Sequence, residues 1–334
     1  MAGKLADIAR QARVSEATVS RVLNGRPGIS DATRAAVLTA LDVVGYERPS
    51  SLRSRKARMV GLVVPELQNP IFPALAEVVA GALAQRGFNA VLCTRTGSMS
   101  EAQYVEMLLE RQVSGMIFAG GQYAEADAPH DHYDRLLQLR LPVVLVNAAA
   151  DHLDFPRVST DDAVAMEQAC AHLAYLGHER IGLILGPPDH VPSRRKRAAF
   201  EAVAPLADEL VESTRFSLEG GHAAATKLIA RGVTGIVCAS DPLALGAIRA
   251  ARRAGLGVPH DLSVVGYDDS VFMACTDPPL TTVRQPIEAI GRAAVEILAG
   301  QIEGSPVPAE ELFFEPEIVA RGSTANAPAL ASLT

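Results

Sequence analysis

The chain has 334 residues, enough for two or three domains, and its 49% hydrophobic and 21% charged residues are typical of a globular protein. No run of about 18 apolar residues is present, which excludes a membrane-spanning helix. The N-terminus lacks the apolar core of a signal peptide. We therefore expect a cytoplasmic protein with no membrane partner. The four cysteines stand far apart without a CxxC pair, which predicts buried free thiols and no structural zinc.

The net charge of −7 at pH 7 is unevenly distributed along the chain. Residues 1–58 contain eleven basic and five acidic residues, whereas the rest contains twenty basic and thirty-three acidic residues. A small basic module attached to an acidic body is typical of a DNA-binding head joined to a regulatory domain. The overall acidity therefore does not exclude nucleic acid as a partner.

The basic module begins with the pattern of a helix-turn-helix. Apolar spacing predicts a helix from about Leu5 to Ala12 and, after a turn, a second helix capped by Ser15. This second helix exposes short polar residues and one arginine, namely Glu16, Ala17, Ser20, Arg21 and Asn24. Such a face can approach base edges in a major groove, where bulky side chains would prevent contact. A third helix, capped by Ser30 and ending at Gly45, completes a small head.

A short polar and basic segment, residues 47–58, follows the head. Leu52 is its only large apolar side chain. Composition alone favours a solvated linker with Leu52 resting on a neighbouring surface.

From Met59 onward, buried strands alternate with helices, which predicts parallel α/β sheets. Two series of similar size, with short elements left over near residues 312–320, indicate two lobes joined by several crossovers. The second series includes a weak strand near Phe216 and a helix capped by Asp241. A cleft at the carboxyl ends of the strands is the expected ligand site. The Ala- and Pro-rich tail from Thr324 is expected to be disordered.

Four further patterns each allow two interpretations. His130-Asp131-His132 fits a surface loop better than a metal site, because no other ligand stands at a known spacing. The pairs Asp161-Asp162 and Asp268-Asp269 fit helix caps better than catalytic carboxylates. The basic block 193–197 is either an anion site at a helix start or a solvated face from which only Lys196 points inward. No nucleophile–base pair or dinucleotide fingerprint is visible, which argues against an enzyme and against a bound cofactor.

The head and the body together carry the motifs of a known family. In the head these are Asp7-Ile8-Ala9, the run from Val14 to Asn24 (VSEATVSRVLN), Ser30 to Arg34, and Gly45-Tyr46. In the body they are VGLVVP at 60–65, NPIF at 69–72, LGHERIG at 176–182, VVGYDD at 264–269 and PPLTTVRQ at 278–285. By these motifs the chain resembles the LacI/GalR family of transcriptional regulators over nearly its whole length.

The resemblance assigns DNA contacts to the head. It implies that Glu16, Ala17 and Arg21 read bases, with Arg21 suited to guanine, Glu16 to a cytosine amine and Ala17 to a thymine methyl. The expected anchors to phosphate groups are Lys4, Ser15, Thr18, Ser20, Asn24 and Arg34. Leu52 aligns with the leucine that family members insert into the minor groove. The segment before it is about three residues shorter than the usual hinge, nearly one helical turn, which limits a hinge helix to Pro49–Ser54.

The resemblance assigns ligand contacts to the cleft. The implied positions are Phe72, Asn147, Lys196, Ser240 and Asp268, with Asp268 bonding sugar hydroxyls and Phe72 offering an apolar face. Three of these differ from residues common in the family, Asn147 from Asp, Lys196 from Arg and Ser240 from Asn. Because the chain lacks tryptophan, any stacking on a sugar ring would fall to Phe72, Tyr123, Tyr267 or Phe272.

The sequence thus predicts an α/β protein with a three-helix head and a two-lobed sensor like the periplasmic binding proteins. The expected parts are a head at 1–48, a hinge at 49–58, an effector-binding and dimerisation body at 59–323, and a tail at 324–334. The N-lobe should span about 59–158 and 286–312, and the C-lobe about 159–285 and 313–323. The expected function is a dimeric, ligand-responsive repressor of carbohydrate-use genes that binds a palindromic operator. The alternative is a sugar-binding protein without a DNA function.

Overall fold

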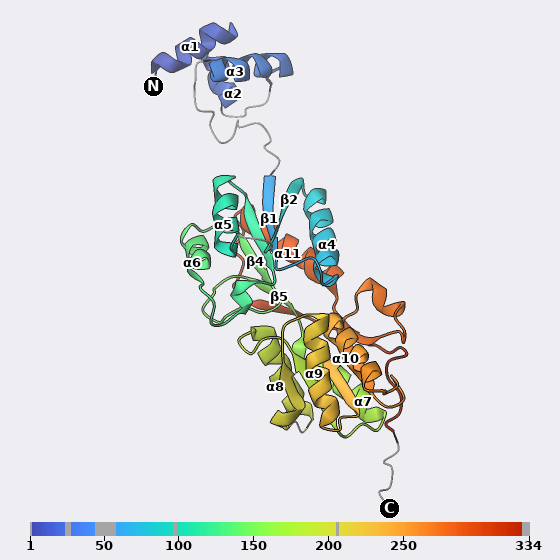
Figure 1. The fold of residues 1–334 in the computed structure, drawn as a ribbon. Helices are drawn as coiled ribbons and strands as arrows, with labels where there is room; N and C mark the ends of the chain where they lie inside the picture. Colours follow the sequence, from blue (N-terminus) through green and yellow to red (C-terminus); the bar gives the residue numbers. More distant parts are fainter. Residues whose placement is uncertain (1, 24–27, 44–57, 96–98, 205–206, 329–334) are drawn as a thin grey trace, which may run out of the picture. The chain divides into compact units, whose positions relative to one another are not determined.

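The computed structural model describes residues 2–23, 28–43, 58–95, 99–204 and 207–328. The chain divides into two compact units, Met1–Arg58 and Met59–Thr334 (Figure 1). The expected α/β class, with a helical N-terminal head and two parallel-dominated sheets, is confirmed.

The N-terminal unit is a three-helix head made of α1 (Ala2–Ala12), α2 (Glu16–Leu23) and α3 (Asp31–Val43). Arg13 takes a left-handed backbone conformation, with φ of 55°, which ends α1 and turns the chain into α2. Ser15 caps α2 as expected, because its hydroxyl accepts the Thr18 N–H at 3.1 Å. The core consists of Ile8, Ala9, Val19, Val22, Leu23, Val37, Ala40 and Leu41. These contacts fix the exposed face of α2.

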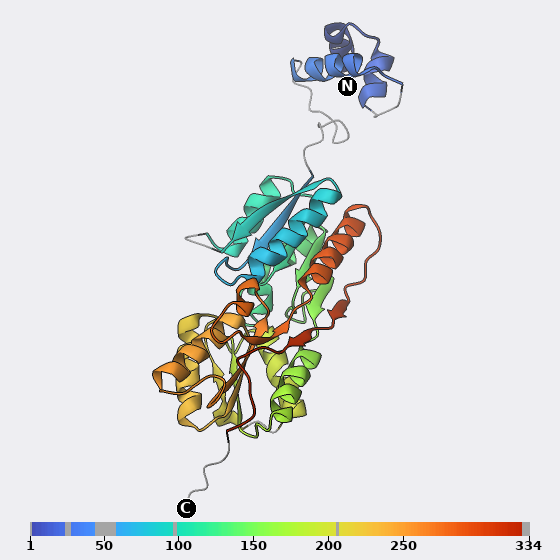
Figure 2. The same cartoon turned by 90° about the vertical axis from the view of Figure 1, so that its right-hand side faces the viewer.

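The first lobe of the larger unit is built on one six-stranded sheet of order β11-β5-β4-β3-β1-β2. Its strands are β1 (Arg58–Val64), β2 (Phe88–Thr94), β3 (Gly115–Ala119), β4 (Val143–Val146), β5 (Arg157–Thr160) and β11 (Glu311–Phe314). Its helices are α4 (Ile71–Gln85), α5 (Glu101–Glu110), the short η1 (Gln122–Ala124), α6 (Asp131–Gln138) and α11 (Ile287–Ile302). Helices α4 and α11 lie side by side although they are far apart in the sequence (Figures 1 and 2).

The second lobe is built on a sheet of order β12-β10-β9-β8-β6-β7, in which only β12 runs antiparallel to its neighbour. Its strands are β6 (Ile181–Leu185), β7 (Val211–Ser213), β8 (Gly235–Cys238), β9 (Ser263–Asp268), β10 (Thr281–Arg284) and β12 (Glu317–Val319). Its helices are α7 (Asp162–Tyr175), α8 (Val191–Val203), η2 (Asp208–Leu210), α9 (Leu218–Ala230), α10 (Asp241–Arg253) and η3 (Val271–Ala274). The strand expected near Phe216 lies earlier, at β7.

Three short connections join the two lobes, after β5, after β10 and after β11. The changes of lobe fall slightly later than the sequence indicated. Thr160 and Phe314 still pair with each other in the first sheet, so the boundaries expected near 158 and 312 move to these residues. The ends of parallel strands from both sheets therefore meet where the chain crosses over.

Two expectations were wrong, one about the disorder of the C-terminal tail and one about the burial of the cysteines. Residues 324–327 are not disordered, because the Thr324 hydroxyl lies 2.9 Å from His172 Nε2 and the Ala327 N–H donates to Leu176 O at 2.8 Å. The thiols of Cys93, Cys170 and Cys238 are buried, but Cys275 is exposed. Its position just after η3 leaves it at the surface.

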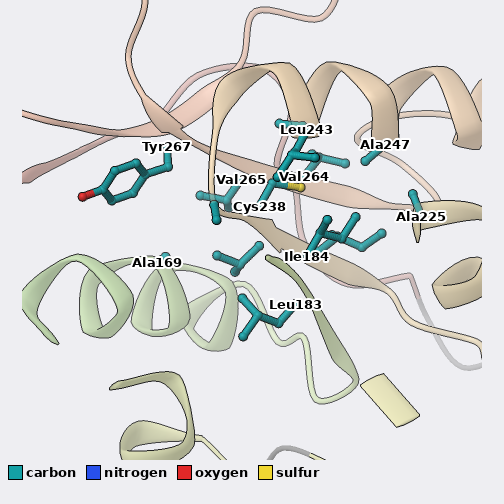
Figure 3. Packing of buried hydrophobic residues seen from close by; sticks show 14 of the residues in the cluster. Ala169, Leu183, Ile184, Ala225, Cys238, Leu243, Ala247, Val264, Val265 and Tyr267 are labelled. Carbon is teal, nitrogen blue, oxygen red and sulfur yellow. The ribbon is translucent and has the colours of Figure 1, made fainter. Parts of the chain in front are cut away.

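The core of the second lobe packs both faces of its sheet. Apolar side chains from α7, α9 and α10 meet those of the central strands, as Cys238, Val264 and Val265 show in Figure 3. Tyr267 lies at the edge of this cluster with its hydroxyl turned away from it. The core thus holds the end of β9 in place, and the polar group of Tyr267 is directed elsewhere.

Helices α9 and α10 approach each other through glycine. A methyl group on Gly246 would lie 2.3 Å from the Leu218 carbonyl oxygen, and one on Gly221 would lie 2.2 Å from the Leu243 carbonyl oxygen. We expect Gly246→Ala to lower the free energy of unfolding by about 1–3 kcal/mol, because rigid backbone must move apart. Gly300→Ala in α11, where the nearest atom would be 3.8 Å away, is the matched control. Equal melting curves for the two variants in urea would contradict this account of the packing.

Candidate functional site

The exposed face of α2 carries the side chains expected to read bases. Glu16, Ala17, Ser20 and Arg21 are exposed, while Val19 and Val22 are fully buried on the opposite face. Thr18 is half-buried, and its hydroxyl lies 2.9 Å from that of Ser15. Arg34, on α3, is half-buried. The head therefore presents one exposed helix face whose short polar residues and single arginine suit a major groove.

The side chains of three residues expected to contact DNA lie outside the described part of the structure. Lys4 lies in α1, but its side chain is outside the described part of the structure. Asn24 and Leu52 lie outside the described residues altogether, as do residues 49–57 of the hinge expected at 49–58. Their roles rest on the sequence motifs.

A cavity of about 510 Å³ lies between the two lobes at the carboxyl ends of the strands, where the sequence placed the ligand. All five expected ligand positions line it: Phe72, Asn147, Lys196, Ser240 and Asp268. Its size is in the range of cavities that enclose small organic ligands. The chain folds so that residues more than a hundred positions apart share one wall.

A hydrogen-bonded chain of polar side chains, most of them buried, forms the base of the cavity. The Asp268 carboxylate accepts the Gln285 amide N–H at 2.7 Å and the Asn69 amide N–H at 3.1 Å. The Gln285 carbonyl oxygen accepts from Thr160 at 2.8 Å and from Asn147 at 3.0 Å. Asn69, Asn147 and Thr160 belong to the first lobe, Asp268 to the second, and Gln285 to a crossover. A ligand in the cavity can therefore alter the hydrogen bonds that join the two lobes.

Asp268 is held under both backbone and electrostatic constraint. Its φ of 118° lies in a region that residues with a side chain rarely adopt, and such outliers cluster at functional sites. Burial raises the pKa of Asp268, and the nearby charge of Asp241 raises it further. Ligand hydroxyls that replaced the lost water would favour its charged form.

Some of the acids that were expected to cap helices have other roles. Asp161 caps α7 as expected. Asp269, however, forms ion pairs with Arg284 at 2.7 Å and Arg321 at 2.6 Å and caps no helix. The cap of α10 is Ser240, whose hydroxyl accepts the Leu243 N–H at 3.4 Å, so Asp241 was assigned wrongly.

Asp241 instead points into the core of the second lobe. Its carboxylate accepts from the Thr282 hydroxyl at 2.7 Å and the Ser270 N–H at 2.8 Å. These bonds tie the start of α10 to strand β10 and to the segment that follows β9.

Lys196 is buried and points into the cavity, at the start of α8. Its ammonium lies 2.6 Å from the Asp162 carboxylate and 4.2 Å from the centre of the Tyr267 ring. The Tyr267 hydroxyl, turned out of the core, lies 3.4 Å from the same carboxylate. The lysine charge is therefore already balanced before any ligand enters.

Aromatic rings supply the apolar surface of the cavity. Phe72 and Tyr267 line it as expected, but Tyr123 does not, because it is buried and its hydroxyl bonds the Phe118 carbonyl oxygen at 3.2 Å. Phe272 is 63% exposed and also lies outside the lining. Phe216, which sequence reasoning missed, lines the cavity.

The position of Phe216 depends on a glycine. A methyl group on Gly186 would lie 2.2 Å from the Phe216 ring, so only glycine at the end of β6 admits the ring there. The ring also meets His190 edge-on, with 5.2 Å between centroids. A glycine directly after a buried strand was the available sequence signal.

Residues 130–132 were expected to form a surface loop, but two of them are buried. His130 and His132 are buried, and His132 Nε2 lies 3.1 Å from the Glu101 carboxylate. Glu101 also accepts the Gln122 N–H at 3.1 Å and the Tyr133 hydroxyl. This polar cluster supports the loop at 120–125 that forms part of the cavity wall. Among the described residues, no group of three or more His, Cys, Asp or Glu is arranged to hold a metal ion.

In the basic block 193–197, Lys196 is the buried cation and Arg194 is exposed, as the solvated-face interpretation predicts, but Arg195 is half-buried and paired. Arg195 on α8 forms a bidentate ion pair with Glu311 on β11, at 2.7 and 2.9 Å, and so joins the two lobes. Arg197 pairs with Glu201 at 2.8 Å on the surface of the same helix. Glu311 also accepts the Ser159 hydroxyl at 2.6 Å. These bonds hold the pKa of Glu311 below its usual value, against the opposing effect of burial.

The Arg195–Glu311 pair should stabilise the observed arrangement of the lobes. We expect a double-mutant cycle with Arg195→Ala and Glu311→Gln to give a coupling energy of about 1–3 kcal/mol. The exposed Arg197–Glu201 pair on the same helix should give about 0.3–0.5 kcal/mol. Because the folded pKa of Glu311 is lowered, its contribution should be present above the ordinary carboxylate range and be lost as pH falls through the folded pKa. Equal coupling energies from urea melts would contradict this assignment.

Comparison with known proteins bears on both units. Residues 4–49 match the family model of bacterial regulatory proteins of the lacI family, and residues 170–324 match that of the periplasmic binding protein-like domain. The chain is 52% identical over 339 residues to the HTH-type transcriptional regulator reg1 of Streptomyces lividans, covering 98% of each chain. The chain belongs to the LacI family. MalR of Streptomyces coelicolor is also 52% identical, over 338 residues and 98% of each chain.

Solved structures of other LacI-family proteins share both the head and the body. The CelR–cellobiose complex superposes with a TM-score of 0.72 and 31% identity, covering 96% of this chain and 99% of that one. The lac repressor dimer bound to operator and the anti-inducer ONPF gives a TM-score of 0.72 and 26% identity, covering 96% and 98%. This LacI-family chain is thus a ligand-responsive, DNA-binding transcriptional regulator. In the described part of the chain, no helix is both long and apolar enough to cross a membrane.

Proposed function

We propose that this regulator is a dimeric repressor of carbohydrate-use genes whose effector is a sugar. The observation that carries the proposal is the base of the cavity, where Asp268, Asn69, Asn147 and Gln285 offer hydrogen-bonding groups beside aromatic rings. Sugars present hydroxyl groups around apolar ring faces and match such a lining. The likeness to a regulator crystallised with cellobiose supports the same class of ligand.

The DNA-binding roles extend the proposal to the head. Arg21, Glu16 and Ala17 would read bases, and Lys4, Ser15, Thr18, Ser20, Asn24 and Arg34 would hold the backbone. Leu52 would enter the minor groove between two head domains. A dimer would place two α2 helices in successive major grooves of a palindromic operator in the cytoplasm. The head at 1–48, hinge at 49–58 and sensor body at 59–323 are the corresponding divisions.

The effector acts, in this proposal, through the contact between the lobes. A ligand shifts an equilibrium only by its different affinity for the two lobe arrangements. A sugar bonded to both Asp268 and Asn147 would favour one separation of the lobes. The spacing of the two hinges in the dimer would change with that separation.

A thermal-shift screen of monosaccharides, disaccharides and sugar phosphates tests the proposed effector. At least one sugar should raise the melting temperature of the full-length protein, because a ligand bound only to the folded state stabilises it. A screen in which no sugar changes the melting temperature at millimolar concentration would refute the proposed effector class.

A further inference from the structure

Carboxyl groups outnumber cationic side chains in the lining of the cavity. Five carboxylates line it: Glu66, Glu125, Asp162, Asp189 and Asp268. The cations of the lining are Arg95, Lys196 and Arg215. Burial, together with the charge of Lys196, lowers the pKa of His190 to about 3, so this lining histidine is neutral at pH 7.

Two of the three cations are already bound to lining carboxylates. Lys196 pairs with Asp162 at 2.6 Å, and Arg95 pairs with Glu125 at 3.1 Å. Arg215 remains, but it is exposed at the rim of the cavity. Little positive charge is therefore available to hold an anionic group inside.

Glu66 and Asp189 differ from the other carboxylates of the lining. Within the described residues, no cation or hydrogen-bond donor contacts either side chain, and both side chains are only half-buried. Burial raises the pKa of Glu66, and no neighbouring cation opposes this effect.

These two carboxylates lie on different lobes. Glu66 follows β1 in the first lobe, and Asp189 follows β6 in the second. The Ala126 N–H donates to the Asp189 carbonyl oxygen at 2.9 Å, so Asp189 stands where the two lobes touch at the cavity. A ligand enclosed by the lobes meets acceptors from both sides.

We propose that Glu66 and Asp189 make the cavity selective for uncharged polyhydroxy ligands and against their phosphorylated or carboxylated forms. A carboxylate only accepts hydrogen bonds, and sugar hydroxyls are donors that satisfy it with strong, charge-assisted bonds. A phosphate at pH 7 brings a charge between −1.5 and −2 and mainly acceptor oxygens, so it is repelled by these two carboxylates, which offer it no donor. This inference rests on the proposed sugar effector and specifies its chemical class.

The test uses calorimetric titration of the full-length protein with matched ligand pairs. The pairs are glucose and glucose 6-phosphate, trehalose and trehalose 6-phosphate, and cellobiose and cellobionate. For a sugar that binds, we expect its anionic form to bind about 100-fold more weakly, since juxtaposed like charges cost several kcal/mol. The double variant Glu66→Gln/Asp189→Asn should reduce this ratio to about tenfold or less.

The matched control is Glu303→Gln, an exposed carboxylate at the end of α11 that does not line the cavity. It should leave the ratio unchanged, which separates a local effect from the effect of net charge. An anionic form that binds as tightly as its parent sugar would overturn the inference and leave the sugar effector standing. A ratio unaltered in the double variant would do the same. Binding of no member of any pair would overturn the sugar effector itself and this inference with it.

Discussion

Replacing Arg21 by alanine should abolish recognition of the operator while effector binding stays unchanged. Arg21 lies on the exposed face of α2, and the buried residues Val22 and Val19 fix the orientation of that face. A bidentate contact from arginine to guanine contributes about 1–3 kcal/mol of discrimination, and a dimer makes it twice, so we expect a loss of specific affinity of about 30-fold or more.

The measurement is fluorescence anisotropy with the selected operator and with a scrambled duplex of equal length. Arg10→Ala is the control, since Arg10 is an exposed arginine on α1 that pairs with Asp7 at 3.4 Å. It removes the same charge, so it should weaken binding to both duplexes slightly and equally. Equal losses on the two duplexes for Arg21→Ala would show that Arg21 contributes charge alone.

Replacing Asp268 should abolish the response to the effector. Asp268 accepts hydrogen bonds from both Asn69 and Gln285, and it is the buried carboxylate that faces the cavity beside them. Losing a charged hydrogen-bond acceptor costs about 1.5–3 kcal/mol for each bond to the ligand, so an Asp268→Ala variant should bind sugar about 100-fold more weakly or not at all.

Alanine also leaves two buried amides without an acceptor, so a second variant is needed. Asp268→Asn keeps the shape and one acceptor oxygen, and it should fold like the parent protein yet lose most of the thermal shift with sugar. Asp134→Ala, an exposed acid on α6, is the control and should keep the full shift. An Asp268→Asn protein with the parent shift would remove Asp268 from the ligand site.

Much of the architecture could be predicted because it follows from periodic patterns. The turn at Arg13, the cap at Ser15 and the buried valines of α2 are local features, and each is visible within a few residues of sequence. The capping box of Ser100 and Gln103 at the start of α5 is another local feature of this kind. The five expected ligand positions line one cavity because strand ends in parallel sheets collect at the same edge.

What sequence reasoning missed depends on contacts between distant segments. Nothing near Arg195 shows that Glu311 lies opposite it, and nothing near Glu101 shows that His132 turns inward. Phe216 enters the cavity only because Gly186, thirty residues earlier, leaves room for its ring. From sequence alone, a short polar run such as Asp268-Asp269 is interpreted as a helix cap at the surface. Asp268 is buried only because the sheets assemble around it, and neighbouring residues do not reveal this.

The most direct test of the central claim is operator binding measured with and without the sugar found in the screen. Oligonucleotides are first selected by the full-length protein at two salt concentrations, and anisotropy titrations then use the enriched sequence. We expect a palindrome to be enriched and the sugar to change its affinity by about tenfold or more, within the usual range of coupling between sites. Enrichment of no palindrome, or an operator affinity that the bound sugar leaves unchanged, would contradict a sugar-responsive, sequence-specific regulator.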